Sequence, residues 1–196
     1  KRATVFINYT LAKVENNTDG AFSAPATGDL NADWGPAAND VRQRLNLTFN
    51  NQVIRNLLVS LNLNTSTGTA YTVRTGNDDN ADLIFNDRPA GVGRNTLRTS
   101  AQWGLNVNVA YLFAFGRLSA PLPPGIGVFG GGGAAQVRTF DPGNLRYRLQ
   151  LFVQATNLTN HANYIGYSGT MTSQFYLKPT SVIGTRKIDA GINFSF

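Results

Sequence analysis

The sequence contains no cysteine and a single histidine, His161, among its 196 residues. Without cysteine there is no disulfide framework and no thiolate metal site. His161 has no second histidine or cysteine with which to share a metal, and no serine-bearing nucleophile motif lies nearby. We therefore expect His161 to be a solvated loop residue, and we do not expect an enzyme.

Charged residues are scarce as well. Asp, Glu, Lys and Arg make up 14% of the chain, against about 25% in ordinary soluble domains, and Asn, Thr, Ser and Gly take their place. The net charge of +6 does not indicate nucleic-acid binding, because no basic run is interleaved with aromatic residues. We expect the arginines to lie scattered at strand ends, in loops or in a wet interior, with no nucleic-acid partner.

Long apolar runs are missing too. The longest, at 109–115, is far shorter than the roughly 18 residues of a membrane-spanning helix, which excludes helical spans. A hydrophobic content of 42% is nevertheless well above that of disordered chains, so the chain should fold as one sizeable domain. It starts at Lys1 without Met or a leader, so either a signal peptide has been removed or the chain is a piece of a longer protein; we expect the piece.

The sequence does contain strict alternation of apolar and polar residues, which is typical of β-strands. No segment has a convincing helical period, so the predicted fold class is all-β. The alternating segments that predict strands lie at residues 4–13, 44–50, 57–66, 102–115, 146–157 and 187–196.

The polar faces of these predicted strands carry Asn, Gln, Ser, Thr and Gly with a few Arg. A soluble sheet usually carries Lys, Glu and Thr on its solvated face, whereas an uncharged polar face opposite an apolar one is typical of an antiparallel transmembrane β-barrel with a wet lumen. Only a closed sheet satisfies its backbone groups in hydrocarbon. Since the smallest such barrels use about eight strands, these six must belong to a larger barrel.

This interpretation assigns each alternating position to lipid or to lumen, and a register slip of one residue would reverse every assignment. The residues predicted to face lipid include Leu45, Leu61, Val107, Leu151 and Ile192. The residues predicted to face the lumen are Asn46, Asn62, Asn106, Asn108, Arg148, Gln150, Gln154 and Asn193.

The connections between the predicted strands alternate in length, as the periplasmic turns and extracellular loops of outer-membrane barrels do. The link at 51–56 is short, and those at 14–42, 73–100 and 160–185 are long. The exception is the Gly- and Pro-rich segment 116–144, which we interpret as a flexible periplasmic insertion. Its GIGVFG run matches the dinucleotide pattern but lacks the flanking strand and helix that such a site needs.

One acidic segment, at 76–87, could bind a cation. It contains Asp78, Asp79, Asn80 and Asp82, which supply the oxygen ligands that Ca²⁺ takes, but it lacks EF-hand spacing and flanking helices. The alternative is that these are turn-forming residues that bond to their own backbone. No other cofactor is expected.

Several runs together resemble one known family. NYTLAK, DWGPAANDVRQR, GTAYTVRTGNDDNADLIFNDRPAGVGRN, LFVQATNLTNHANY and the terminal GINFSF are similar to the C-terminal end of TonB-dependent outer-membrane receptors. The likeness is to the Oar-like branch, which has a carboxypeptidase-regulatory-like N-terminal domain. It spans nearly the whole chain and is most specific at 76–95 and 152–160.

The resemblance implies a barrel of about 22 strands in the outer membrane of a Gram-negative bacterium. Its partners would be outer-membrane lipid, an unidentified ligand captured by the outer loops, and TonB, which acts through a plug upstream of this segment. The family also ends in an apolar strand with a terminal aromatic that the barrel-assembly machinery reads. Here the matching residues are Ile192, Phe194 and Phe196.

Two other functions stay open. A non-transporting surface barrel, such as an adhesin, would have the same wall but no plug. A soluble carbohydrate-binding β-sandwich would need charged outward faces and a convergent polar site. The ligand class, whether siderophore, oligosaccharide, peptide or protein, does not follow from the sequence.

Overall fold

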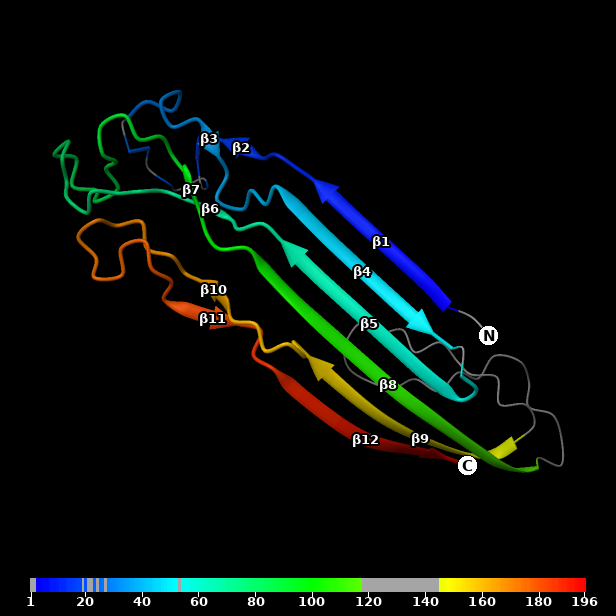
Figure 1. The fold of residues 1–196 in the computed structure, drawn as a ribbon. Coiled ribbons are helices and arrows are strands. Elements are labelled where there is room, and N and C mark those ends of the chain that lie inside the picture. Colours follow the sequence, from blue (N-terminus) through cyan, green and yellow to red (C-terminus); the bar gives the residue numbers. More distant parts are fainter. Residues whose placement is uncertain are drawn as a thin grey trace.

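The computed structural model describes residues 3–18, 20, 23, 25–26, 28–52, 54–117 and 145–196. The fold is all-β, and its six long strands form one antiparallel sheet in the order β1-β4-β5-β8-β9-β12 (Figure 1). Their bounds are Ala3–Leu11, Gln43–Asn51, Leu57–Ser66, Gln102–Arg117, Leu145–Thr156 and Lys187–Ser195. Each of the six predicted strands is confirmed, with ends that differ by at most two residues. Among the described residues, no helix is long and apolar enough to cross a membrane.

Three short two-stranded ribbons lie in the long loops beyond one end of this sheet (Figure 1). They pair β2 (Glu15–Asn16) with β3 (Gly35–Pro36), β6 (Ala70–Tyr71) with β7 (Leu97–Arg98), and β10 (Asn163–Ile165) with β11 (Ser181–Ile183). The short connection at 52–56 lies at the other end, as the alternation of link lengths predicted. Residues 118–144 of the predicted insertion are outside the described part of the chain.

The pairing register mostly places polar residues opposite polar residues and apolar residues opposite apolar residues, so that residues of one kind form rows across the strands. Asn8 lies opposite Asn46 and Asn46 opposite Asn64, while Ile7, Leu47, Leu63 and Leu105 form a neighbouring apolar row. Adjacent rows face opposite sides of the sheet because side chains alternate. By this register, one polar face carries Asn46, Asn62, Asn106, Asn108, Arg148, Gln150, Gln154 and Asn193.

The sheet is a single layer, because no second sheet covers either face within the described ranges. Apolar side chains therefore stay exposed, with Ile7 at 60% and Ile192 at 68%. β1 and β12 form the two edges and do not pair with each other, so the described strands do not close into a barrel.

A close contact joins the last two strands on the polar face. Phe152 on β9 lies opposite Gly191 on β12, and a Cβ at position 191 would come within 2.5 Å of the Phe152 ring. Glycine therefore lets the aromatic ring lie across β12. Aromatic residues commonly cover strand glycines in this way.

Candidate functional site

The three long loops, comprising the described residues of 12–42, 67–101 and 157–186, form what we call the loop cap. It contains every buried polar or charged side chain of the described chain: Asp33, Asp40, Asp87, Arg94, Asn95, Asn157 and Asn163. Buried polar groups must find partners, and most of the partners described below come from a different loop. The loop cap is thus an ordered structure and the principal candidate for a functional surface.

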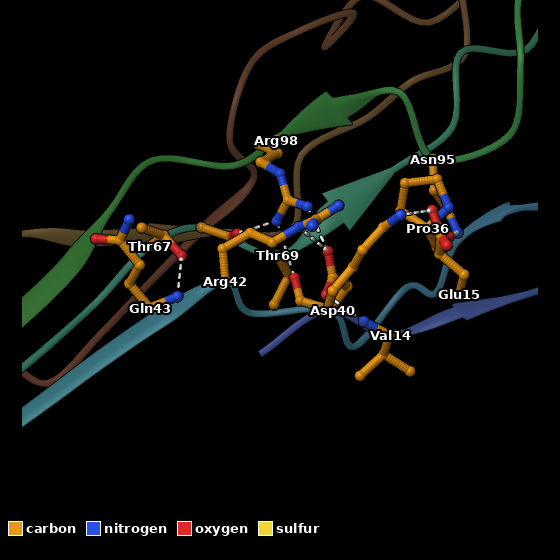
Figure 2. A network of polar contacts seen from close by, with 12 residues as sticks. Val14, Glu15, Pro36, Asp40, Arg42, Gln43, Thr67, Thr69, Asn95 and Arg98 are labelled. Atoms are coloured by element: carbon orange, nitrogen blue, oxygen red, sulfur yellow. Dashed lines mark hydrogen bonds and ion pairs between the residues drawn. The ribbon is translucent and has the colours of Figure 1, made fainter. Parts of the chain in front are cut away.

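Asp40 joins the first loop to the second (Figure 2). Its carboxylate is fully buried and forms ion pairs with Arg98 and with Arg42, whose Nε lies 2.7 Å from Oδ2. Oδ1 accepts a hydrogen bond of 2.8 Å from the backbone N–H of Val14. Arg98 also donates to the carbonyl oxygens of Asp40 and Gly68 at 3.0 and 3.1 Å.

The surroundings of Asp40 keep its carboxylate ionised. Burial alone would raise the pKa of this carboxyl, but hydrogen bonds from Arg98 and from the Val14 N–H outweigh that effect, aided by the charges of Arg42 and Arg98. The net result is a lowered pKa. Two guanidinium groups then share one carboxylate, which leaves one positive charge in excess at this point of the cap.

A second connection between the same loops centres on Asp33. Its Oδ1 lies 2.6 Å from Nη2 of Arg88, and its Oδ2 accepts a 3.0 Å hydrogen bond from the N–H of Ala26. Arg94 donates from Nε to the Asp33 carbonyl oxygen at 3.0 Å and also bonds Asn16. Both arginines come from the second loop, so the two loops are held together at two separate points.

The third loop is attached to the second through backbone hydrogen bonds. The N–H of Arg74 donates to the carbonyl of Gly169, and the N–H of Met171 donates to the carbonyl of Arg74, both at 2.9 Å. A Cβ at Gly169 would lie 1.8 Å from the Thr72 carbonyl oxygen, so glycine alone permits this approach. Nearby, Tyr71 packs on Tyr167, and burial, followed by the neighbouring tyrosines, raises the pKa of Tyr71.

The acidic segment of the second loop bonds to its own backbone. Asp78 accepts hydrogen bonds of 3.0 Å from the N–H groups of Asp82 and Leu83, and Asp82 accepts one of 2.8 Å from Ile84. The N–H of Asp79 donates to a carboxylate oxygen of Asp87 at 2.7 Å. No group of three or more His, Cys, Asp or Glu residues suited to a metal occurs in the described ranges. The turn interpretation therefore accounts for Asp78 and Asp82, and we propose no metal here.

Asn80, the fourth predicted cation ligand, connects loops instead. Its side-chain amide donates to Asp82 at 3.1 Å and to the carbonyl of Ala26 in the first loop at 3.3 Å. His161 stacks on Trp103 with ring centroids 4.6 Å apart.

Where the polar face of the sheet meets the loop cap, there is a cleft of about 470 Å³, which we call the polar cleft. Its floor comes from β4, β5 and β8, and its rim from loop residues. Only Asn46 among the predicted lumen-facing residues lines it. The lining residues are Val41, Arg44, Asn46, Asn64, Thr65, Ser66, Thr67, Thr69, Gln102, Trp103, Gly104 and Asn163.

The chain ends at the opposite end of the sheet from the cap (Figure 1), and the predicted assembly residues lie in or just after its last strand, β12. Phe194 stacks on Tyr147 with ring centroids 6.2 Å apart and lies 6.0 Å from the ring of Phe196. Phe196 is 87% exposed and Ile192 is 68% exposed. These side chains are available to an apolar environment or a partner, and their role as an assembly signal stays a prediction.

Sequence reasoning missed the arginine and aspartate pairs of the loop cap and most of the polar cleft. Asp40 and Arg98 are 58 residues apart, so no local motif connects them. The one usable signal was complementary charge: aspartates at 33 and 40 in the first loop, and arginines at 88, 94 and 98 in the second.

Comparisons with known proteins add no identification. No family model matches the chain, and neither the curated proteins nor the solved structures contain a significant match. The functional argument therefore rests on the chemistry of the sheet and of the loop cap.

Proposed function

We propose that the chain forms six consecutive strands of the wall of a TonB-dependent receptor in a bacterial outer membrane. The loop cap lies on the outer side and captures a ligand. The apolar face contacts lipid, and the polar face lines the lumen. Energy for uptake comes from TonB through a plug supplied by another part of the receptor.

The observation that carries this proposal is the exposed apolar face. Six strands about 4.8 Å apart, each at least nine residues long, cover an area of at least about 24 by 30 Å. That exceeds the contiguous apolar patch of about 300 to 600 Å² that a typical monomeric soluble protein exposes. Exposures of 57% at Val5, 60% at Ile188 and 68% at Ile192 show that the described part of the chain does not cover this face. A lipid environment would cover it.

The strand lengths also suit a membrane. β1, β4 and β12 each have nine residues, which span about 30 Å at 3.4 Å per residue. Tilted by about 40°, such a strand crosses about 23 Å, close to the apolar band of about 25 Å in outer-membrane barrels.

Aromatic residues on the apolar face supply a second line of support. Toward the end of the sheet away from the loop cap, the rings of Tyr111 and Phe113 contact each other with centroids 4.5 Å apart. Phe115, Tyr147 and Phe194 form a second group across three neighbouring strands, with successive centroid distances of 5.4 and 6.2 Å. Outer-membrane barrels carry girdles of aromatic residues at the membrane interfaces.

The two free edges of the sheet fit the same proposal. An unpaired strand edge is a template for pairing with another strand, and β1 and β12 are both edges here. In the proposed receptor each pairs with a strand from the rest of the wall. A β-sandwich would instead place a second sheet over the apolar face, and the described residues supply none.

The topology can be tested with epitope tags in the full-length receptor expressed in its host. A tag after Ala90, in the loop cap, should be labelled on intact cells, whereas a tag in the 52–56 connection should be labelled only after the outer membrane is permeabilised. Labelling in the opposite sense would contradict the proposed orientation. Fractionation of both tagged proteins away from the outer membrane would contradict the barrel itself.

The distinction between a transporter and a non-transporting surface barrel needs a separate observation. The coding sequence upstream of Lys1 should contain a globular region large enough to plug the lumen. If that sequence encodes only further barrel strands, the transport part of the proposal is wrong, and the wall alone remains.

A further inference from the structure

We propose that the polar cleft binds an acidic saccharide, a hydroxyl-rich ligand whose carboxylate or phosphate group pairs with Arg44. The inference rests on the proposed function, because a lumen gives such a ligand access to the polar face. It adds a ligand class and a binding position.

The floor of the cleft is made of two cross-strand rows. Arg44, Ser66 and Gln102 form one row, and Asn46, Asn64 and Gly104 form the next. Neighbouring strands are about 4.8 Å apart, and successive residues on one face are about 7 Å apart. The floor therefore measures about 10 by 7 Å, which accommodates one or two sugar rings. A volume of about 470 Å³ is also within the range of about 300 to 1,000 Å³ for small-molecule sites.

The charge of the cleft favours an anion. Arg44 is the one charged residue among the described lining residues, and no carboxylate lines the cleft. Its guanidinium forms no ion pair within the described ranges. Asp40 and Arg42, which flank the lining residue Val41, belong to the cluster that has one excess positive charge. A free guanidinium binds carboxylate or phosphate groups through two parallel hydrogen bonds.

The rest of the lining matches hydroxyl groups. The carboxamides of Asn46, Asn64 and Gln102 both donate and accept hydrogen bonds, and so do the hydroxyl groups of Ser66 and Thr67. A sugar hydroxyl has the same double capacity. Within the described structure the side chains of Asn46 and Gln102 have no hydrogen-bond partner, so both are available to a ligand.

The backbone of the floor argues against a peptide bound by strand addition. That mode of recognition needs the free edge of a sheet. β4 and β5 pair with strands on both sides at the cleft. The part of β8 that lines the cleft pairs with β5 on one side, and on its other side Trp103 bonds the side chain of Asn163 and the carbonyl of Leu105 accepts from the N–H of Leu158. Recognition in the cleft must therefore come from side chains, as it does for saccharides.

A large side chain in place of Gly104 would fill the cleft without disturbing the pairing of the strands. A Cβ at this position would meet no heavy atom within 4 Å, and the backbone angle φ is not positive. A phenylalanine at position 104 would add a ring to the floor of the cleft, opposite Asn64 in the same cross-strand row. Gly104→Phe should thus block binding while the strand pairing stays intact.

The test uses the full receptor chain folded in detergent micelles and titrated calorimetrically. The probes are a trimer of galacturonic acid, glucose 6-phosphate and neutral maltotriose. At least one acidic probe should bind at least about tenfold more tightly than maltotriose, since a charge-assisted hydrogen bond accounts for about that factor. The acidic probe that binds identifies the source of the anionic group.

Two arginine variants on the same face of the sheet supply the matched comparison. Arg44→Gln should weaken the binding of that probe at least about tenfold. Arg148→Gln removes the same charge from the far end of the sheet, where Arg148 lies opposite Ala114 and Ser195, and should leave affinity unchanged. Gly104→Phe should abolish binding.

The inference is overturned if acidic and neutral probes bind equally, if the two arginine variants have equal effects, or if the folded chain binds no probe. Heat-modifiable gel mobility and protease protection in lipid vesicles report folding independently of any ligand. A chain that inserts but does not bind refutes the saccharide site alone. A chain that fails to insert refutes the proposed receptor wall.

Discussion

At the scale of single residues, Asp40 shows how one buried charge orders long loops. It is the only large side chain among the described residues with less than 2% exposure, and it bonds the first and second loops at once. Loops usually lie at the surface, because a buried loop must find hydrogen-bond partners for its backbone groups and counter-charges for its charged side chains. Here an arginine from the second loop, Arg98, supplies a counter-charge for the buried Asp40.

Replacement of Asp40 with asparagine should therefore open the cap. Arg42 and Arg98 would face each other without a counter-charge, and removing one partner of a buried pair costs about 3 to 5 kcal/mol. Both arginines are about one-third exposed, so we expect about 2 to 4 kcal/mol of lost local stability. Hydrogen exchange at Val14 and Arg98 would measure it. Asp189→Asn, which removes an exposed pair with Lys187, should have little effect.

The pH dependence of the cap follows from the same carboxylate. Because its pKa is lower in the folded state, the stabilisation is fully present above the unfolded-state value of about 3.9 and is lost as the pH falls through the folded value. Amide protection at Val14 should thus be equally strong at pH 7 and pH 5 and should fall only below about pH 4. Loss of protection between pH 7 and pH 5 would show that another group controls the loops.

At the scale of elements, the six strands divide into two faces by simple alternation. Val107 lies on the apolar face opposite Leu61 and Ala155. Its neighbour Asn108 lies on the polar face opposite Ser60 and Gln154. The two residues are consecutive on β8. Substitutions at these two positions therefore compare the environments of the two faces of the sheet directly.

If the proposed barrel is correct, Val107→Arg should destabilise it by about 2 to 4 kcal/mol, the cost of a charge on a lipid-facing side near the bilayer midplane. Asn108→Arg should cost much less, because the proposed wet lumen would solvate the guanidinium. Reversible folding of the full receptor into lipid vesicles, followed by denaturant titration, measures both. Equal penalties at the two positions would contradict the assignment of the faces.

At the scale of the whole molecule, the predicted assembly signal lies at the end of the chain, just beyond β12. Phe196 is the most exposed large hydrophobic residue of the described chain, at 87%, and contacts the ring of Phe194. In the proposed barrel, burial of this side chain in lipid would contribute at most about 1.5 to 3 kcal/mol to stability. A large barrel would survive that loss, so a strong effect of removing it must come from biogenesis.

Deletion of Phe196 from the full-length receptor should cause the chain to accumulate unassembled in the periplasm, while Phe194→Ala should do less harm. The reason is that the proposed assembly signal requires a terminal aromatic residue. Outer-membrane fractionation of the two variants provides the measurement. Normal surface levels after the deletion would leave β12 as an ordinary edge strand with no signal.

The strands could be predicted from the sequence because each strand shows the alternation of apolar and polar residues within its own segment. Leu57–Ser66 agrees at both ends, and the side assigned to residues such as Asn62 and Gln150 follows from that period and the observed register. The loop cap could not be predicted in the same way. Its contacts join residues such as Arg94 and Asn16, which are 78 positions apart, and depend on how three loops fold over one another.

The contacts between the loops of the loop cap also limit which changes in loop sequence the protein can accept during evolution. Each loop leaves and re-enters the sheet on adjacent antiparallel strands. Doubling the length of a loop therefore costs only about 0.6 kcal/mol in closure entropy and leaves the sheet register unchanged. Asp33 and Asp40, however, depend on arginines of the next loop. The first two loops are thus expected to evolve as a linked pair, whereas the third, attached to the second through backbone carbonyl and amide groups, can change most of its side chains independently.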